Sequence, residues 1–151
     1  MSYLSVISLT QAKNHLRIDQ DFEVDDNSIE RMISSALELI EKNTSHLVYQ
    51  RMKTYYRSEG ESRISVFDYP INNYDTEVTA LHYSLKHEFH TDTITLDVGY
   101  ISPYDVPSPL IDVALMLIEN WYYESENEGN KSDIPERANS IMFTYKRCIV
   151  S

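Results

Sequence analysis

The chain is poor in the residue types that form disulfides, phosphate-binding loops and membrane spans. It has one cysteine, Cys148, and three glycines, Gly60, Gly99 and Gly129. A lone cysteine excludes an internal disulfide and fits a reducing cytoplasm, and glycines so far apart exclude a Gly-rich phosphate loop. The longest apolar run, Val113–Ile118, is far below the roughly 20 residues that span a bilayer. We therefore expect no membrane segment, and no secretory signal is visible.

Positive charge is scarce as well. The chain has 13 Lys and Arg residues and 24 Asp and Glu residues, which gives a formal net charge of −11. Sequence-independent binding to nucleic-acid phosphates needs a basic surface, so the charge argues against such a surface. It does not exclude a protein that surrounds DNA without binding it, because an acidic wall repels the duplex and keeps it mobile.

The first part of the chain, residues 8–47, predicts two helices joined by a polar link. Ser8 and Gln11 have the spacing of a capping box, which satisfies two unpaired backbone groups at a helix start. Two apolar stripes with helical spacing follow: Leu9, Ala12 and Leu16, then Ile29, Met32, Ile33, Ala36, Leu37 and Ile40. A short polar link between two such stripes is typical of an αα-hairpin.

The middle part, residues 53–100, changes to short segments with β propensity. They lie at 54–57, 63–67, 78–83 and 93–98. The stretch from Leu81 to Leu96 predicts an antiparallel hairpin whose polar tip lies near Lys86–Asp92. Pro70 either ends its segment or places it on a sheet edge.

The last part, residues 108–149, predicts helices again. Ser108 and Pro109 suit the N-cap and the first helical position. The helix that follows is apolar on almost every side, so it is either a central core helix or partly covered by another subunit. Asp133 and Glu136 repeat the capping-box spacing, with Pro135 in the first turn, before a final amphipathic helix.

These patterns predict a single domain of the α+β class that is predominantly α-helical. We expect a small bundle of about four helices with an inserted antiparallel β-hairpin or small sheet. A chain of this length buries roughly 70% of the surface of its unfolded form, so it needs no metal or disulfide to fold.

One acidic stretch approaches the pattern of a calcium-binding loop. Its oxygen ligands would be Asp19, Asp21, Glu23, Asp25, Asn27 and Glu30. However, Val24 stands where the sharp turn needs glycine, and Glu23 is too long for its position. Carboxylates just before a helix are also favoured by the helix dipole, and we therefore prefer solvated acids that cap the helix.

Three histidines, His82, His87 and His90, lie near Glu88 and Asp92. Zinc needs convergent ligands held by further contacts, which the tip of a hairpin supplies poorly. We favour exposed loop histidines over a metal site. Cys148 has no histidine nearby in the sequence, and we expect no catalytic residue, no cofactor and no bound metal.

The order of these parts resembles the head–tail connector (adaptor) proteins of tailed double-stranded-DNA bacteriophages. The resemblance covers roughly residues 5–149 and rests on the sequence of elements and the short motifs between them. Those motifs are Leu16-Arg17-Ile18-Asp19, Val98-Gly99-Tyr100, Val106-Pro107-Ser108-Pro109-Leu110, Trp121-Tyr122 and Ile134-Pro135.

The resemblance implies a non-enzymatic virion protein whose residues 1–151 form one head–tail connector domain. Such a protein is made in the host cytoplasm and located in the neck of the virion. It is expected to form a homo-oligomeric ring, a dodecamer, beneath the portal protein and to dock a stopper or tail-completion protein. DNA would pass through the lumen of the ring without sequence-specific binding, and no membrane is involved.

A head-to-tail ring needs two different contact faces on each subunit. The apolar helix and the final helix are the candidates, and the expected subunit or portal contacts are Met116, Tyr122, Tyr123, Phe143 and Tyr145. Two alternatives remain open. The first is a small cytoplasmic regulatory or binding module with a ligand at the β insertion, and the second is a metal hydrolase built on the histidines.

Overall fold

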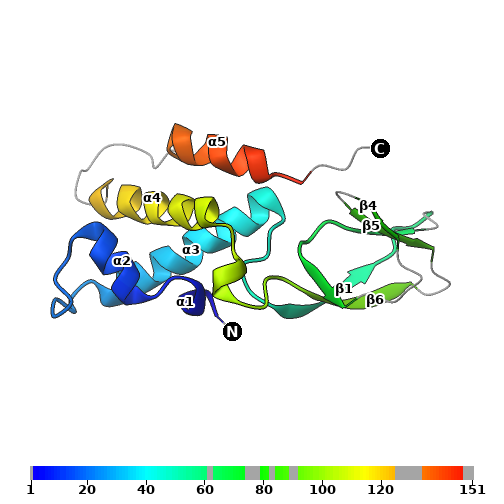
Figure 1. Cartoon of the computed structure of the whole chain (residues 1–151), viewed down its shortest axis with the longest axis horizontal. Coiled ribbons are helices and arrows are strands. Elements are labelled where there is room, and N and C mark those ends of the chain that lie inside the picture. Colours follow the sequence, from blue (N-terminus) through cyan, green and yellow to red (C-terminus); the bar gives the residue numbers. More distant parts are fainter. Residues whose placement is uncertain are drawn as a thin grey trace.

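Helices form both ends of the chain and strands form its middle (Figure 1). The computed structural model describes residues 2–60, 63–73, 79–81, 84–88, 92–124 and 134–147. The helices are α1 (Tyr3–Val6), α2 (Leu9–Leu16), α3 (Asp26–Thr44), α4 (Ser108–Glu124), α5 (Glu136–Tyr145) and a 3₁₀ turn, η1 (Pro103–Asp105). The predicted class, α+β and predominantly helical, is confirmed. The described residues hold five α-helices rather than about four, because the single turn of α1 is too short to give a periodic pattern.

The capping box predicted for α2 is present. The backbone N–H of Gln11 donates to Ser8 Oγ at 3.2 Å, and the backbone N–H of Ser8 donates to Gln11 Oε1 at 2.9 Å. The long helix α3 extends beyond its apolar stripe at both ends and stops at Ser45, whose φ of 61° is left-handed.

The starts of the last two helices differ from the prediction. Ser108 is the first helical residue of α4, and the carbonyl of Pro107 accepts the N–H of Leu110 at 2.9 Å. A proline at the second position is tolerated because the first N–H groups of a helix have no partner within it. Pro135 stands just outside α5 rather than in its first turn. Asp133, the other half of the predicted capping box, lies outside the described residues.

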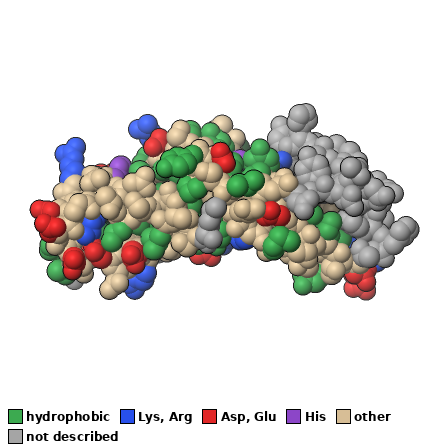
Figure 2. Space-filling model, turned by 60° about the horizontal axis from the view of Figure 1, so that its bottom comes forward, with side chains coloured by type: hydrophobic (Ala, Val, Ile, Leu, Met, Phe, Trp, Pro, Cys, Tyr) green, Lys and Arg blue, Asp and Glu red, His purple; other side chains and the backbone are tan. Residues whose placement is uncertain are grey.

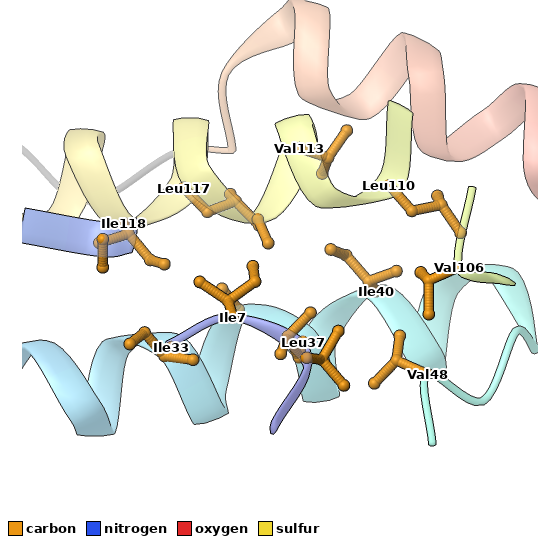
Figure 3. Close-up of a cluster of buried hydrophobic side chains, with 14 of the residues drawn as sticks. Ile7, Ile33, Leu37, Ile40, Val48, Val106, Leu110, Val113, Leu117 and Ile118 are labelled. Atoms are coloured by element: carbon orange, nitrogen blue, oxygen red, sulfur yellow. The ribbon is translucent and has the colours of Figure 1, made fainter. Parts of the chain in front are cut away.

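The main hydrophobic core lies between α3 and α4 (Figure 3). Ile33 and Leu37 of α3 face Leu117 and Ile118 of α4, and all four side chains are fully buried. The connection between α1 and α2 adds Ile7 to this cluster. Because α2, α3 and α5 all contact α4, this apolar helix is mainly a core helix.

Within the described residues, the strands form two three-stranded antiparallel sheets. They are β1 (Arg51–Tyr56), β2 (Arg63–Val66), β3 (Ile71–Asn73), β4 (Thr79–Leu81), β5 (Ser84–Glu88) and β6 (Thr93–Val98). The first sheet has the order β1-β6-β3 and the second has the order β2-β5-β4. A second, smaller core lies among them, with buried members Leu47, Ile64, Val66, Leu96 and Val98.

The predicted hairpin between Leu81 and Leu96 is wrong. Leu81 ends β4 and pairs with Ser84 of β5, so Lys86 lies within a strand rather than in a tip. Leu96 pairs instead with Lys53 of β1, far away in the sequence. Residues 84–88 are mostly polar but contain no Gly, Pro, Asn or Asp, and Ser84 is the one residue among them that favours a turn. Polarity alone was a poor signal for a loop.

Gly99 holds a position that no other residue fits. Its φ is +100°, and a Cβ added there would lie 2.1 Å from the carbonyl oxygen of Tyr49. Gly99 also bonds to its neighbours through both backbone groups: its N–H donates to the Pro70 carbonyl at 2.8 Å, and its carbonyl accepts Asn72 Nδ2 at 2.7 Å. The strand that leaves the sheet here therefore runs directly against the chain that enters it.

We predict that Gly99→Ala destabilises the protein by about 3 kcal/mol or more, since both the left-handed backbone and the close approach oppose a Cβ. Gly60→Ala is the matched control. Gly60 also has a positive φ, +83°, but a Cβ added to it would meet nothing within 4 Å. The control should lose only about 1 kcal/mol in urea unfolding. Equal losses in the two variants would contradict the steric argument.

Candidate assembly surfaces

A buried carboxylate joins the helical part to the first sheet. Glu41 of α3 accepts two hydrogen bonds from Arg51 at the start of β1, at 2.6 and 3.1 Å. It also accepts the Tyr3 hydroxyl at 3.0 Å and the backbone N–H of Val48 at 2.9 Å. Burial lowers the pKa of Arg51, but the bonds and charge of Glu41 outweigh this and raise it. One carboxylate thus binds α1, α3 and β1 together.

A second junction is aromatic and centres on His46, which follows α3. Its Nδ1 shares a 2.8 Å hydrogen bond with the Tyr100 hydroxyl, and its ring packs edge-on against Tyr69 and Tyr145. The guanidinium of Arg147 lies 4.3 Å from the centre of the Tyr69 ring. Burial, followed by the charge of Arg147, lowers the pKa of His46 to about 4, so the imidazole is neutral near pH 7. This cluster attaches the end of α5 to the sheets.

The acidic loop between α2 and α3 is held by a buried lysine. Lys13 Nζ lies 2.5 Å from Asp26 Oδ1 and donates to the carbonyls of Gln20 and Phe22 at 3.1 and 2.8 Å. Asp25 stands at the N-cap of α3, but its side chain makes no capping bond. The prediction of capping acids is therefore wrong at Asp25. Within the described residues, no three His, Cys, Asp or Glu side chains gather to hold a metal ion.

Two of the predicted contact residues make bonds within the chain itself. The hydroxyl of Tyr122 donates to Asp25 Oδ2 at 2.7 Å, and the hydroxyl of Tyr123 donates to the carbonyl of Leu16 at 2.9 Å. The first bond ties the end of α4 to the loop before α3, and the second ties it to the end of α2. Each tyrosine therefore has a structural role within the subunit, in addition to any contact that its exposed atoms make with another protein.

The other three predicted contact residues lie in different surroundings. Met116 is half-buried on α4. Tyr145 is also half-buried and packs on His46, with the ring centres 5.6 Å apart. Phe143 of α5 is 76% exposed. The five residues thus differ in exposure, and Phe143 is the most accessible of them.

The histidine cluster cannot be assembled from the described part of the chain. His87 belongs to β5, where it pairs with Ile64 of β2. His82 and His90 lie outside the described residues.

Exposed hydrophobic side chains occur at places that the sequence analysis passed over. Tyr104 in η1 is 97% exposed, and Met52 and Tyr56 of β1 are 66% and 72% exposed. Figure 2 shows such side chains spread over one face of the molecule, with acidic side chains at the end that carries the acidic loop. The alternation of Met52, Thr54 and Tyr56 along one strand was the signal that could have revealed Met52 and Tyr56.

Residues 6–150 match the family described as "Phage gp6-like head-tail connector protein". The chain belongs to this family. Its role is therefore that of a structural connector protein of the virion, as the order of its elements had suggested. No curated protein sequence matches the chain.

Solved structures with the same fold come from particles of a gene transfer agent (GTA). A chain from "Neck of empty GTA particle computed with C6 symmetry" gives a TM-score of 0.72 at 13% identity and covers 97% of this chain and 92% of that chain. "Virion of native gene transfer agent (GTA) particle" gives 0.73 at 13% identity, with coverages of 100% and 94%. "Neck of native GTA particle computed with C12 symmetry" gives 0.67 at 10% identity, with coverages of 97% and 91%. At these identities the likeness establishes the connector fold.

None of the helices in the described residues is both long enough and apolar enough to cross a membrane.

We predict that Glu41→Gln destabilises the connector by about 2–3 kcal/mol, because it removes the charge that Arg51 pairs with in a mostly buried site. The control is Glu38→Gln, one turn earlier on α3, where the side chain is exposed. It should change stability by less than about 0.5 kcal/mol. Urea unfolding of both variants measures the difference, and equal effects would contradict the role given to Glu41.

We predict that His46 makes the folded state less stable as pH falls from about 6.5 to about 4. Its pKa is 6.5 in the unfolded chain and about 4 in the folded protein, so the unfolded chain binds more protons in this window. The neutral imidazole contributes fully to the free energy of unfolding above pH 6.5. At pH 5 this contribution is smaller by about 2 kcal/mol. Urea unfolding at pH 7 and pH 5 measures it.

His46→Phe should show a correspondingly smaller change in stability between these two pH values. Tyr100→Phe is the control, since it removes the 2.8 Å bond but keeps the imidazole. That variant should be less stable at both pH values yet keep the pH dependence. If His46→Phe kept the full pH dependence of stability seen in the wild type, that dependence would belong to other titratable groups.

Proposed function

We propose that the chain is one subunit of a homo-oligomeric ring that sits beneath the portal protein in the neck of a phage particle. The family match over residues 6–150 is the observation that carries this proposal. The full-length fold likeness to chains of GTA necks supports it, and the C12 symmetry stated for one of those necks fits a dodecamer. The subunits are made in the host cytoplasm and join the particle during assembly.

The ring extends the channel of the portal and presents its other side to a stopper or tail-completion protein. The net charge of −11 supports this arrangement, because an acidic lumen does not retain passing DNA. The role is mechanical rather than catalytic. The bonds of Glu41 and His46 across the two cores support a single connector domain for the whole chain.

The proposed contact residues are Met116, Tyr122, Tyr123, Phe143 and Tyr145, and the burial of their side chains ranks them. Phe143 is the strongest of the five, because a mostly exposed aromatic side chain on an otherwise polar helix surface is a typical interface anchor. Tyr122 and Tyr123 use their hydroxyls within the subunit, so they can offer only their ring faces.

The test is co-purification with the portal protein of the same phage, followed by electron microscopy of the complex. We expect a ring bound to the portal. Phe143→Asp should weaken this binding about tenfold or more, since an unpaired charge is costly to bury. The control is Thr144→Asp, at an exposed neighbouring position. Absence of portal binding by the wild-type chain would overturn the proposal, and equal binding by both variants would remove Phe143 from the interface.

A further inference from the structure

The first sheet has one face toward the smaller core and one face toward solvent. The register of β1 and β6 places Lys53 opposite Leu96 and Tyr55 opposite Ile94 on the core side. On the other side, three cross-strand pairs lie in a row: Met52 with Asp97, Thr54 with Thr95, and Tyr56 with Thr93. We call the side chains of Met52, Thr54, Tyr56, Thr93 and Thr95 the outer sheet face.

The outer sheet face is accessible and its surface is ordered. All five side chains are exposed. The hydroxyls of Thr54 and Thr95 bond to each other at 2.8 Å, which fixes the middle of the face. Met52 and Tyr56 flank this pair, and methionine and tyrosine are enriched in the centres of protein interfaces.

Charge is confined to the two ends of the face. At one end Asp97 accepts the side chain of Gln50 at 2.6 Å, and at the other end Arg57 pairs with Asp92. Apart from Asp97, the residues of the three cross-strand pairs carry no charge, although charged residues make up 25% of the chain. A centre with little charge and a polar rim is the usual composition of an interface.

The net charge of the protein indicates what covers this face. Two copies that each carry −11 repel each other, so they can approach closely only through surfaces where charge is absent or paired. A basic partner would instead be drawn to the acidic surfaces, and DNA would be repelled everywhere. An uncharged face on so acidic a protein therefore fits another copy of the same chain.

We propose that the outer sheet face is a contact between neighbouring copies of this chain in the ring. This inference rests on the proposed ring and names one of its surfaces. Met52 and Tyr56 supply the apolar contact, and the Thr54–Thr95 pair keeps the sheet surface flat between them. The copy that covers the face contributes a different surface, as a closed ring requires.

The test compares Met52→Glu and Tyr56→Glu with Val24→Glu by sedimentation velocity over a range of concentrations. Val24 is 81% exposed in the acidic loop, so the control adds the same charge at an exposed apolar position elsewhere. Circular dichroism checks that each variant is folded. A Met52→Ser/Tyr56→Ser double variant removes the apolar contact without adding charge, should a glutamate prevent folding.

We expect the wild type and Val24→Glu to form rings and both outer-face variants to associate about tenfold more weakly or not at all. Rings formed equally well by the outer-face variants would overturn this inference and leave the proposed ring intact. A wild-type chain that stays monomeric at every concentration, with or without the portal protein, would overturn both.

Discussion

The carboxylate of Glu41 is the interaction on which the arrangement of the two cores depends. The helical core is complete without the sheets, and the sheets have a small core of their own. Because the two cores are separate, their packing alone does not set the orientation of the helical part relative to the sheets. Glu41 supplies it, since the bonds from Arg51 and the N–H of Val48 set where the chain leaves α3 and enters β1. The bidentate geometry of Arg51 makes this joint directional as well as strong.

The joint has a second side, which is aromatic and neutral. His46, Tyr69 and Tyr100 fill the space where the chain enters and leaves the sheets, and Tyr145 brings α5 onto them. Burial and then the neighbouring tyrosines raise the pKa of Tyr100, so its hydroxyl stays protonated and available to His46. The ionic and aromatic sides together make the helical part and the sheets one mechanical unit.

The sequence predicted the helices well and the strand pairing poorly, for a physical reason. Helices are encoded locally: the Ser8–Gln11 capping box and the stripe from Ile29 to Ile40 needed no knowledge of distant residues. The partner of a strand is a distant segment, and Leu96 could not be assigned to Lys53 from local pattern. The contact residues were harder still, because Tyr122 and Tyr123 have the composition of interface residues yet bond within the subunit. These hydrogen bonds were not visible in the sequence.

Lys13 makes the acidic loop more rigid than its composition suggests. Residues 17–25 are mostly polar and lie at the end of the molecule, where independent motion would be expected (Figure 1). The buried ammonium group, however, contacts Asp26 and two loop carbonyls at the same time. The loop cannot lift away without breaking all three contacts and exposing a charge that the fold has enclosed. Its opening is therefore cooperative with the packing of α2 on α3, and this end of the subunit behaves as a firm edge.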